Sequence, residues 1–248
     1  LNTPQGEVRV ECHHIIARLG AIAPRQLVES FGVKFPNNNL DALPLLNEHY
    51  QSSVRGLYII GALGGFPLIK QAMNQGYDVI EHIKGHQIKA ADYPLLAGQF
   101  SQLPYVLDAE DILSLYQKRV PMFKQMTVLT FRELIIESDI ARSSKDVALL
   151  ALKKTTRHET NIVKSGLPLY EQGEYGSTFY TLIEGSVTLI DTDGLETQLR
   201  AGQFFGENSL LSGHPHDNSA FINDETIVIA TPRRIMIKLI NSNDVIGD

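Results

Sequence analysis

The sequence has little of what marks a secreted, metal-binding or membrane-spanning protein. Its 248 residues include one cysteine, Cys12, and a single thiol can form neither an internal disulfide nor the paired-cysteine site of a structural zinc ion. No hydrophobic run approaches the ~18–20 residues of a membrane-spanning helix, and the N-terminus has no apolar signal core. We therefore expect a cytoplasmic protein with no metal site and no membrane segment. The first residue is not methionine, so we also expect a missing upstream portion.

Positive charge is scarce. The chain carries 22 Lys and Arg against 28 Asp and Glu, a net charge of −6, and the acidic excess lies after residue 100. A nucleic-acid partner would favour a basic face, and the sequence contains no basic block. The residues after Ile240 are too few for a helix-turn-helix. Nucleic acid is therefore not an expected partner.

Motifs for catalysis are missing as well. No G-x-G-x-x-G occurs, so the sequence lacks the pyrophosphate loop of a dinucleotide-binding fold. No Ser/His/Asp or metal-binding arrangement is visible either, and we predict no catalytic residue. Five histidines are expected to be scattered polar surface or capping residues: His13, His14, His49, His82 and His86.

What is present is enough hydrophobic sequence for a packed core, 43% of the residues. The length fits one large domain or two small ones. We predict an α+β chain in three parts. Residues 1–95 combine short β-like runs, a glycine-rich turn and a helix, residues 96–160 are a helical connector, and residues 161–248 are an antiparallel β jelly roll (a double-stranded β-helix) with flanking helices.

The first part contains a hydrophobic run, a glycine-rich loop and a helix in succession. Residues 56–60 predict a buried strand, which runs into the loop 61–65. Pro67 then opens a helix whose apolar or small residues recur three and four positions apart, so that one face is expected to pack against a sheet. This order presents free backbone N–H groups to an anion or a cofactor. A shorter helix is expected over residues 24–31.

Three helices are predicted in the connector. Asp108 and Thr127 are suited to cap helices over residues 109–118 and 128–137. A third helix is expected over residues 144–154.

The last part alternates strands with turns. Asp193-Gly194 indicates a hairpin, and Thr231-Pro232 reads as the start of a helix over residues 233–240. The predicted strands are residues 179–183, 186–191 and 226–230.

Residues 119–240 resemble a cyclic nucleotide-binding domain. Two motifs carry the resemblance. The first comprises residues 171–180, EQGEYGSTFY, and residues 183–187, IEGSV. The second is residues 201–211, AGQFFGENSLL, which is similar to the family's phosphate-binding cassette with its core F-G-E-x-[AS]-L. Residues 120–123 would belong to the helix that precedes the family's roll.

The resemblance implies a site for cyclic AMP or cyclic GMP in the cassette. A short helix from Gly206 would offer N–H groups to the cyclic phosphate, and Glu207 would accept a hydrogen bond from the ribose 2′-hydroxyl. Ser209 would help to hold the phosphate oxygens. The implied ligand-binding residues are Phe205, Gly206, Glu207, Asn208, Ser209, Asn218, Ser219 and Ala220.

The sequence departs from the family where the cassette closes. The family has R-[ST]-A, whereas this chain has Asn218-Ser219-Ala220, preceded by Asp217. Loss of the charge-assisted bond between arginine and phosphate costs about 1.5–3 kcal/mol, and Asp217 would repel the ligand. His214 and His216 could supply the charge only at acid pH. We therefore expect weak binding. The alternative is a degenerate roll that acts as an interaction or dimerisation scaffold without a nucleotide ligand.

Residues 8–90 resemble the closing portion of the thioredoxin-reductase-like flavin oxidoreductases. Residues 54–61, VRGLYIIG, are similar to that family's V-x-G-L-Y-A-x-G-D, residues 70–72, KQA, to its [RK]-Q-A, and residues 16–21 to the strand that joins its two domains. The family holds the flavin phosphate and ribityl chain at its Gly-Asp pair, but this chain has Ala62 in place of the Asp. The implied remnant of the flavin site is Gly61, Ala62, Lys70, Gln71 and Ala72.

Together the two resemblances predict a regulatory module joined to a fragment of an oxidoreductase. In the intact parent, electrons would pass from the reduced nicotinamide of NAD(P)H to FAD, and ligand sensing by the roll would gate that reaction. Because this chain lacks both dinucleotide loops, we expect it to bind neither cofactor and to be inactive alone. The expected partners are the upstream oxidoreductase portion and a weakly bound cyclic nucleotide, with a homodimer left open.

Overall fold

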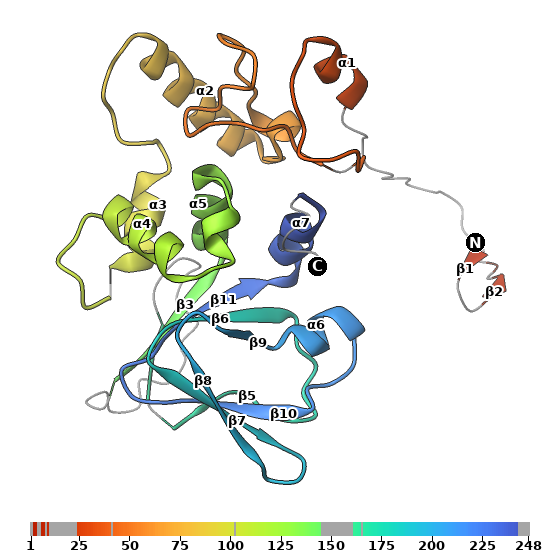
Figure 1. Ribbon diagram of the computed structural model, residues 1–248, viewed down its shortest axis with the longest axis vertical. Helices are drawn as coiled ribbons and strands as arrows, with labels where there is room; N and C mark the ends of the chain where they lie inside the picture. The colour runs from red at the N-terminus through yellow and green to blue at the C-terminus, as the bar shows by residue number, and fades with distance from the viewer. Residues whose placement is uncertain are drawn as a thin grey trace.

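The computed structural model describes residues 2–3, 6–7, 9, 24–40, 42–101, 103–144, 161–164 and 166–242. From top to bottom, Figure 1 shows helices α1 and α2, then helices α3 to α5 with α7 at the same level, then a roll of strands with α6 beside it. The helices are α1 Arg25–Ser30, α2 Ile69–Ile83, α3 Tyr93–Phe100, α4 Ala109–Arg119, α5 Val128–Glu137, α6 Glu207–Ser212 and α7 Arg233–Ser242, with 3-10 turns η1 Gly61–Gly64 and η2 Phe123–Gln125. The strands are β1 Asn2–Thr3, β2 Gly6–Glu7, β3 Asp139–Ser144, β4 Asn161–Lys164, β5 Pro168–Tyr170, β6 Thr178–Glu184, β7 Ser186–Asp191, β8 Glu196–Arg200, β9 Phe204–Phe205, β10 Asn218–Ile222 and β11 Ile227–Pro232.

The predicted strand over residues 56–60 does not form. Tyr58 makes only an isolated bridge with Gln51, and the glycine-rich loop after it is the 3-10 turn η1. A strand needs a neighbour along its length to satisfy its backbone groups, and the described residues between 24 and 95 supply none. The helices on either side of this run, α1 and α2, agree with the prediction.

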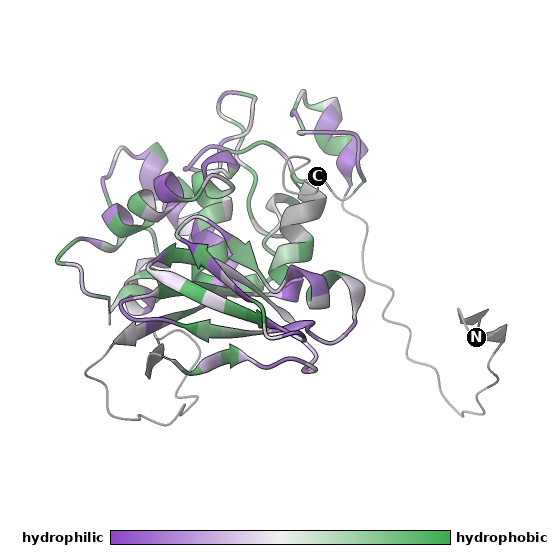
Figure 2. Cartoon of the chain, turned by 60° about the horizontal axis from the view of Figure 1, so that its bottom comes forward, coloured by the Kyte–Doolittle hydropathy of each residue, from purple (hydrophilic) through white to green (hydrophobic). Residues whose placement is uncertain are grey.

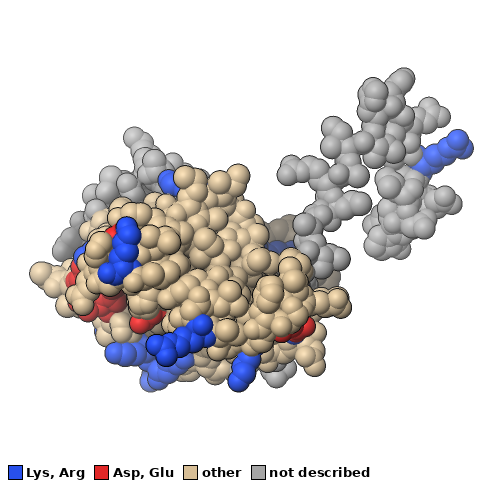
Figure 3. Space-filling view, turned by 90° about the horizontal axis from the view of Figure 1, so that it is seen from above, with Lys and Arg blue, Asp and Glu red and all other residues tan. Residues whose placement is uncertain are grey.

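The prediction that one face of α2 packs against a sheet is also wrong. The helix forms, but its apolar residues do not pack against a sheet. Of its side chains only Gln75 and Val79 are buried, whereas Ile69, Met73 and Ile80 are more than half exposed. Figure 3 views the molecule from the α2 side and shows a broad surface without charged side chains.

Helices α4 and α5 begin where their capping residues predict. The Asp108 carboxylate accepts a hydrogen bond from the N–H of Glu110 at 3.1 Å, and the Thr127 hydroxyl accepts one from the N–H of Thr130 at 3.1 Å. Each cap satisfies a backbone donor that the first helical turn leaves unpaired.

The predicted helical connector contains a strand. Residues 139–144 form β3, which pairs antiparallel with β11 and parallel with β4. Ser144 therefore ends a strand and does not begin a helix, and the rest of the helix predicted over 144–154 lies outside the described residues. Tertiary pairing decides this segment, because Ile140 is fully buried in the core shared by helices and roll.

The roll consists of two sheets. One has the strand order β5-β10-β7-β8 and the other β4-β3-β11-β6-β9. The hairpin predicted at Asp193-Gly194 joins β7 to β8. Thr231 and Pro232 do not cap α7, because they continue the ladder of β11 with β6. In Figure 2 the strands carry hydrophobic stretches and the turns between them are mostly hydrophilic.

One core joins the helical layer to the roll. It contains Tyr116, Phe123 and Phe131 from the helical layer, together with Ile140 and Ile183 from the roll. A separate core lies within the roll. The part of the chain that contains α1, η1 and α2, which we call the upper lobe, adds only small clusters. One of these clusters reaches α5 through Leu129.

A buried arginine on α5 ties these layers together. The guanidinium of Arg132, with a side chain only 9% exposed, lies 2.6 Å from the carboxylate of Asp92 at the start of α3 and 3.5 Å from that of Glu110 on α4. The hydroxyl of Tyr50 in the upper lobe has a raised pKa, because burial and the carboxylates of Asp92 and Asp78 disfavour the phenolate. Arg132 thus links α3, α4 and α5 and lies in one buried polar group with Tyr50.

Removal of Asp92 alone should lower the free energy of unfolding strongly, whereas removal of both Asp92 and Arg132 should lower it less. Asp92→Ala removes the carboxylate closest to the buried guanidinium and leaves it the more distant Glu110, so we expect the free energy of unfolding to fall by roughly 2–3 kcal/mol. Asp92→Ala combined with Arg132→Met should regain at least half of that loss, because no uncompensated charge remains. Urea denaturation of both variants measures this. Glu110→Ala, at the more exposed end of the group, is the control and should cost less than about 1 kcal/mol.

Candidate functional site

The cassette forms the predicted turn and helix. Phe205 ends β9, Gly206 has the left-handed backbone conformation with φ of 82°, and α6 begins at Glu207. A Cβ at position 206 would lie 2.9 Å from the ring of Tyr180, so both the backbone and the space require glycine there. The N-terminal turn of α6 is thereby held against β6.

The two motifs of the resemblance meet in space. The N–H of Gly176 donates to the Ser209 hydroxyl at 2.8 Å, and the N–H of Gln172 donates to the Ser219 hydroxyl at 2.9 Å. The backbone of His216 bonds in both directions with this same turn, through Glu174 and Gly173. Ser209, predicted to hold phosphate oxygens, and Ser219, predicted to be ligand-binding, therefore connect their segments to the turn at residues 171–176.

Aromatic rings fill the space between the cassette and the roll. The rings of Tyr180 and Phe205 stack at 5.1 Å, and those of Tyr170 and His216 stack at 3.7 Å. Phe205 and His216 are nearly fully buried. These rings rigidify the cassette from within.

The residue in the position of the family's arginine is already engaged. The Asn218 side chain accepts a hydrogen bond from the Tyr170 hydroxyl at 2.9 Å and donates one to the carboxylate of Asp217 at 2.8 Å. Ala220 is fully buried in β10, whereas Asn208 is exposed on α6. A phosphate near Asn218 would therefore meet an amide that is held by two neighbours.

The electrostatics around the cassette are negative. Between Lys164 and Arg233 the sequence holds one basic residue, Arg200, and ten Asp and Glu. Burial raises the pKa of Tyr170, and after the neighbouring Tyr180 the carboxylates of Glu207 and Asp217 raise it further. Both carboxylates thus act on the place where an anionic phosphate would bind.

His216 does not replace the missing cation. Burial lowers its pKa, and the nearby carboxylates of Asp217 and Glu174 offset this effect only in part. The ring is 5% exposed and is neutral at physiological pH. His214, the other candidate, is exposed.

The residues of the flavin resemblance lie around the start of α2. The N–H of Gly61 donates to the buried side-chain oxygen of Gln75 at 2.7 Å, so a neighbouring side chain already satisfies the amide that would face a cofactor phosphate. Ala62 is exposed and offers no carboxylate. Ala72, also a member of the predicted set, packs against Gly61. Residues 16–21 lie outside the described residues.

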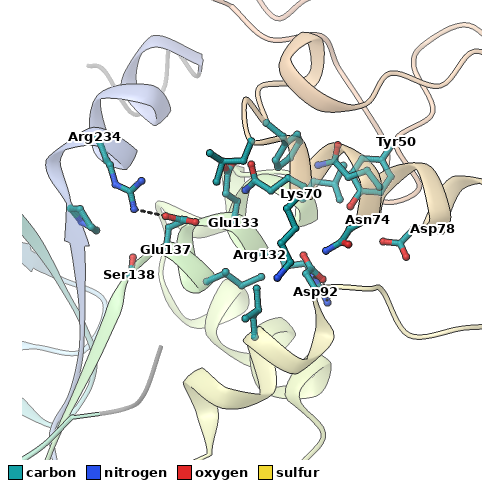
Figure 4. Close-up of a pocket in the computed structure, with 18 of the residues that line it drawn as sticks. Tyr50, Lys70, Asn74, Asp78, Asp92, Arg132, Glu133, Glu137, Ser138 and Arg234 are labelled. Carbon is teal, nitrogen blue, oxygen red and sulfur yellow. Dashed lines mark hydrogen bonds and ion pairs between the residues drawn. The ribbon is translucent and has the colours of Figure 1, made fainter. Parts of the chain in front are cut away.

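Lys70 and Gln71 border a cavity of about 600 Å³ between the layers. Figure 4 shows Lys70 and Asn74 on the α2 side of this cavity and Glu137 with Arg234 on the opposite side. Arg234, on α7 of the roll, forms an ion pair with Glu137 on α5. The cavity therefore brings the upper lobe, α5 and the last helix of the roll to one place, which the sequence motifs did not predict.

Three histidines that were predicted to be scattered lie around one cavity. The rings of His49 and His82 stack at 3.7 Å, and both line a second cavity together with His86. The imidazole of His86 contacts the carboxylate of Glu81 at 2.5 Å. Among the described residues no group of three or more His, Cys, Asp or Glu side chains is placed to bind a metal ion. His13 and His14 lie outside these residues.

The match to a protein family lies in the last third of the chain. Residues 161–243 match the family model of the cyclic nucleotide-binding domain. A cyclic nucleotide-gated potassium channel of Rhizobium etli is 37% identical over 68 residues, which are 27% of this chain and 18% of the channel. The chain thus spans less than a fifth of that relative's length. These matches support the predicted cyclic nucleotide-binding domain.

Similar solved structures include regulatory and sensor domains. The regulatory domain of Toxoplasma gondii PKA with cAMP is 20% identical, with a TM-score of 0.40 over 53% of this chain and 46% of that chain. The sensor domain of the transcriptional regulator DNR from Pseudomonas aeruginosa is 15% identical, with a TM-score of 0.42 over 54% and 84%. At these scores the likeness carries no functional conclusion. Within the described residues, no helix is both long and apolar enough to cross a membrane.

Acid should destabilise the protein through His216. The unfolded chain binds a proton near pH 6.5, whereas the folded pKa is lower, so below that pH the unfolded state holds more protons. The free energy of unfolding should therefore fall as the pH drops through 6.5. His216→Phe keeps a ring on Tyr170 and should flatten this dependence, as measured by urea denaturation between pH 8 and pH 5. His214→Phe is the matched control. An unchanged slope in His216→Phe would contradict the assignment.

Proposed function

We propose that the roll is a regulatory module that binds a cyclic nucleotide weakly. The observation that carries this proposal is the cassette itself, in which Gly206 turns the chain into α6 and leaves Glu207 half-buried at its first position. Backbone N–H groups at a helix start attract phosphate, and the Glu207 carboxylate can accept a hydrogen bond from a ribose hydroxyl. The family match over residues 161–243 supports the same ligand class.

Weak affinity follows from the closing segment of the cassette. The position that the resemblance assigns to arginine holds Asn218, whose amide is held by Tyr170 and Asp217, and the carboxylates of Glu207 and Asp217 lie nearby. An anion must therefore enter without a charge-assisted bond and against repulsion. Either cyclic AMP or cyclic GMP satisfies this reasoning, because none of these contacts reads the base.

The second candidate is a roll without a nucleotide ligand, which serves as a scaffold. The observation that favours it is the stack of His216 on Tyr170 beside the cassette. If these rings close the site by their shape, a restored charge will not open it. The experiment below separates the two candidates.

We further propose that the roll gates a flavin oxidoreductase in an intact parent protein. The support is the shared cavity, where Lys70 and Gln71 of the upper lobe lie across from the Arg234–Glu137 ion pair. A shift of α7 on ligand binding would break or move that ion pair and so change the wall of the cavity.

The residues of this chain do not by themselves fit a flavin. Gly61 donates its N–H to Gln75, and Ala62 lacks the carboxylate that the resemblance requires. FAD and NAD(P) are therefore proposed only for the intact parent, with the upstream oxidoreductase portion supplying the dinucleotide loops. For this chain we propose no catalysis, no metal, and no nucleic-acid or membrane partner.

Asn218→Arg should strengthen nucleotide binding. A charge-assisted bond to phosphate contributes about 1.5–3 kcal/mol, so titration calorimetry should show affinity for cyclic AMP or cyclic GMP rising by about one to two powers of ten. Asp217→Thr in the same protein removes the nearby carboxylate and should add to the gain.

Glu207→Gln in the Asn218→Arg background is the matched control. It keeps the shape of the side chain and removes its charge, so ribose recognition should weaken and the gain should shrink. No gain in Asn218→Arg would favour the scaffold, and tight binding by the unaltered chain would mean that another group supplies the charge.

A further inference from the structure

Two carboxylates beside the cassette lack a compensating cation. Glu207 is half-buried at the first position of α6, and Asp217 is exposed just before β10. Among the described residues neither carboxylate has an ion-pair partner. Asp217 accepts a hydrogen bond from the Asn218 amide at 2.8 Å, but an amide is neutral and leaves the charge of the carboxylate in place.

Both carboxylates act on the same hydroxyl. The pKa of Tyr170 is raised first by burial and by Tyr180, and then by the carboxylates of Glu207 and Asp217. The Tyr170 hydroxyl donates to Asn218 at 2.9 Å, the residue at the position that the resemblance assigns to arginine. The two negative charges therefore act on the part of the cassette where the family places the phosphate.

The polar groups closest to the cassette serine are neutral as well. A Cβ at Gly176 would collide with the Nε2 atom of His216 and lie 3.1 Å from the Ser209 hydroxyl oxygen, so this ring nitrogen and this hydroxyl lie side by side. Burial lowers the pKa of His216, an effect that the carboxylates of Asp217 and Glu174 oppose only in part. At neutral pH the ring therefore supplies no charge to an anion.

A cyclic nucleotide and a nucleoside differ most at such a place. The cyclic phosphate is an anion and uses the 3′ and 5′ oxygens, so that only the 2′-hydroxyl remains as a donor on the ribose. A nucleoside is uncharged and offers its 2′, 3′ and 5′ hydroxyls. Hydroxyl groups donate strong, charge-assisted hydrogen bonds to carboxylates, whereas a phosphate and a carboxylate repel each other. Two uncompensated carboxylates therefore favour the nucleoside.

We propose that the cassette is selective for an uncharged nucleoside over a cyclic nucleotide. The inference rests on the proposed function, because it uses the same site and the same ribose contact with Glu207. Asp217 accepts a hydrogen bond from a ribose hydroxyl that a cyclic nucleotide does not have. Adenosine and guanosine both satisfy this reasoning, because neither carboxylate reads the base.

The test is titration calorimetry of the full chain at about pH 7.5 with adenosine, guanosine, cyclic AMP and cyclic GMP. We expect a nucleoside to bind at least about tenfold more tightly than the cyclic nucleotide of the same base. Salt identifies the cause, because it screens the repulsion between phosphate and carboxylates. A rise from about 50 mM to about 500 mM NaCl should therefore strengthen cyclic-nucleotide binding and change nucleoside binding by less than about twofold.

Asp217→Asn should change the two affinities in opposite directions. The substitution removes the negative charge and keeps a side-chain oxygen, so cyclic-nucleotide affinity should rise by about threefold to tenfold and nucleoside affinity should fall by a similar factor. Asp111→Asn, with the same change in net charge at an exposed position of α4, is the matched control and should change neither. Circular dichroism checks that both variants keep the fold.

Failure of this inference can be told apart from failure of the proposed function. A cyclic nucleotide that binds as tightly as its nucleoside or more tightly, or an Asp217→Asn variant that changes neither affinity, would overturn the inference alone. Absence of nucleoside binding, with cyclic-nucleotide binding gained in Asn218→Arg, would do the same. If neither ligand binds the unaltered chain or Asn218→Arg, the proposed nucleotide site itself is wrong.

Discussion

The buried guanidinium of Arg132 is the interaction on which the arrangement of layers depends. It holds the start of α3 through Asp92 and reaches α4 through Glu110, and Tyr50 of the upper lobe lies in the same polar group. A charge taken out of water is tolerated only where such partners surround it. The nearby side chain of Gln99, fully buried, donates to the carbonyls of Ile136 and Ser138, so α3 is also fixed where α5 passes into β3. Helices and roll therefore form one packed unit, and the upper lobe joins it at this group.

The cassette illustrates how one set of contacts can serve stability and limit binding. Ser209 and Ser219 link it to the turn at residues 171–176, while Tyr170 donates to Asn218 and stacks on His216. Each contact satisfies a polar group or fills space beneath the cassette. The same contacts engage the groups that would otherwise meet a phosphate, in a roll with few cations. The cassette thus forms its turn and helix, while position 218 holds an uncharged asparagine.

The sequence predicted those features whose causes are local. Asp108 and Thr127 cap helices because their side chains reach the next backbone N–H groups, and Gly206 turns the chain because only glycine fits that backbone conformation beside Tyr180. The strand predicted over residues 56–60 was wrong, because a hydrophobic run cannot by itself supply the neighbouring strand with which it would have to pair. Residues 139–144 form β3 because β11 pairs with them, which no nearby residue could signal.

Sequence alone thus determined the caps and predicted the roll's motifs and an uncharged residue, Asn218, where the resemblance implies an arginine, since each is written in a short span of residues. Tertiary structure alone decided which groups meet. It joined Gly61 to Gln75, stacked His49 on His82, placed Arg234 of α7 against Glu137 of α5, and left several apolar side chains of α2 exposed. An amphipathic period says that a helix has an apolar face, but it does not say what that face packs against. That depends on the surfaces the rest of the chain presents: within the described residues Val79 of α2 packs with Leu129 of α5, whereas Ile69 and Met73 stay exposed.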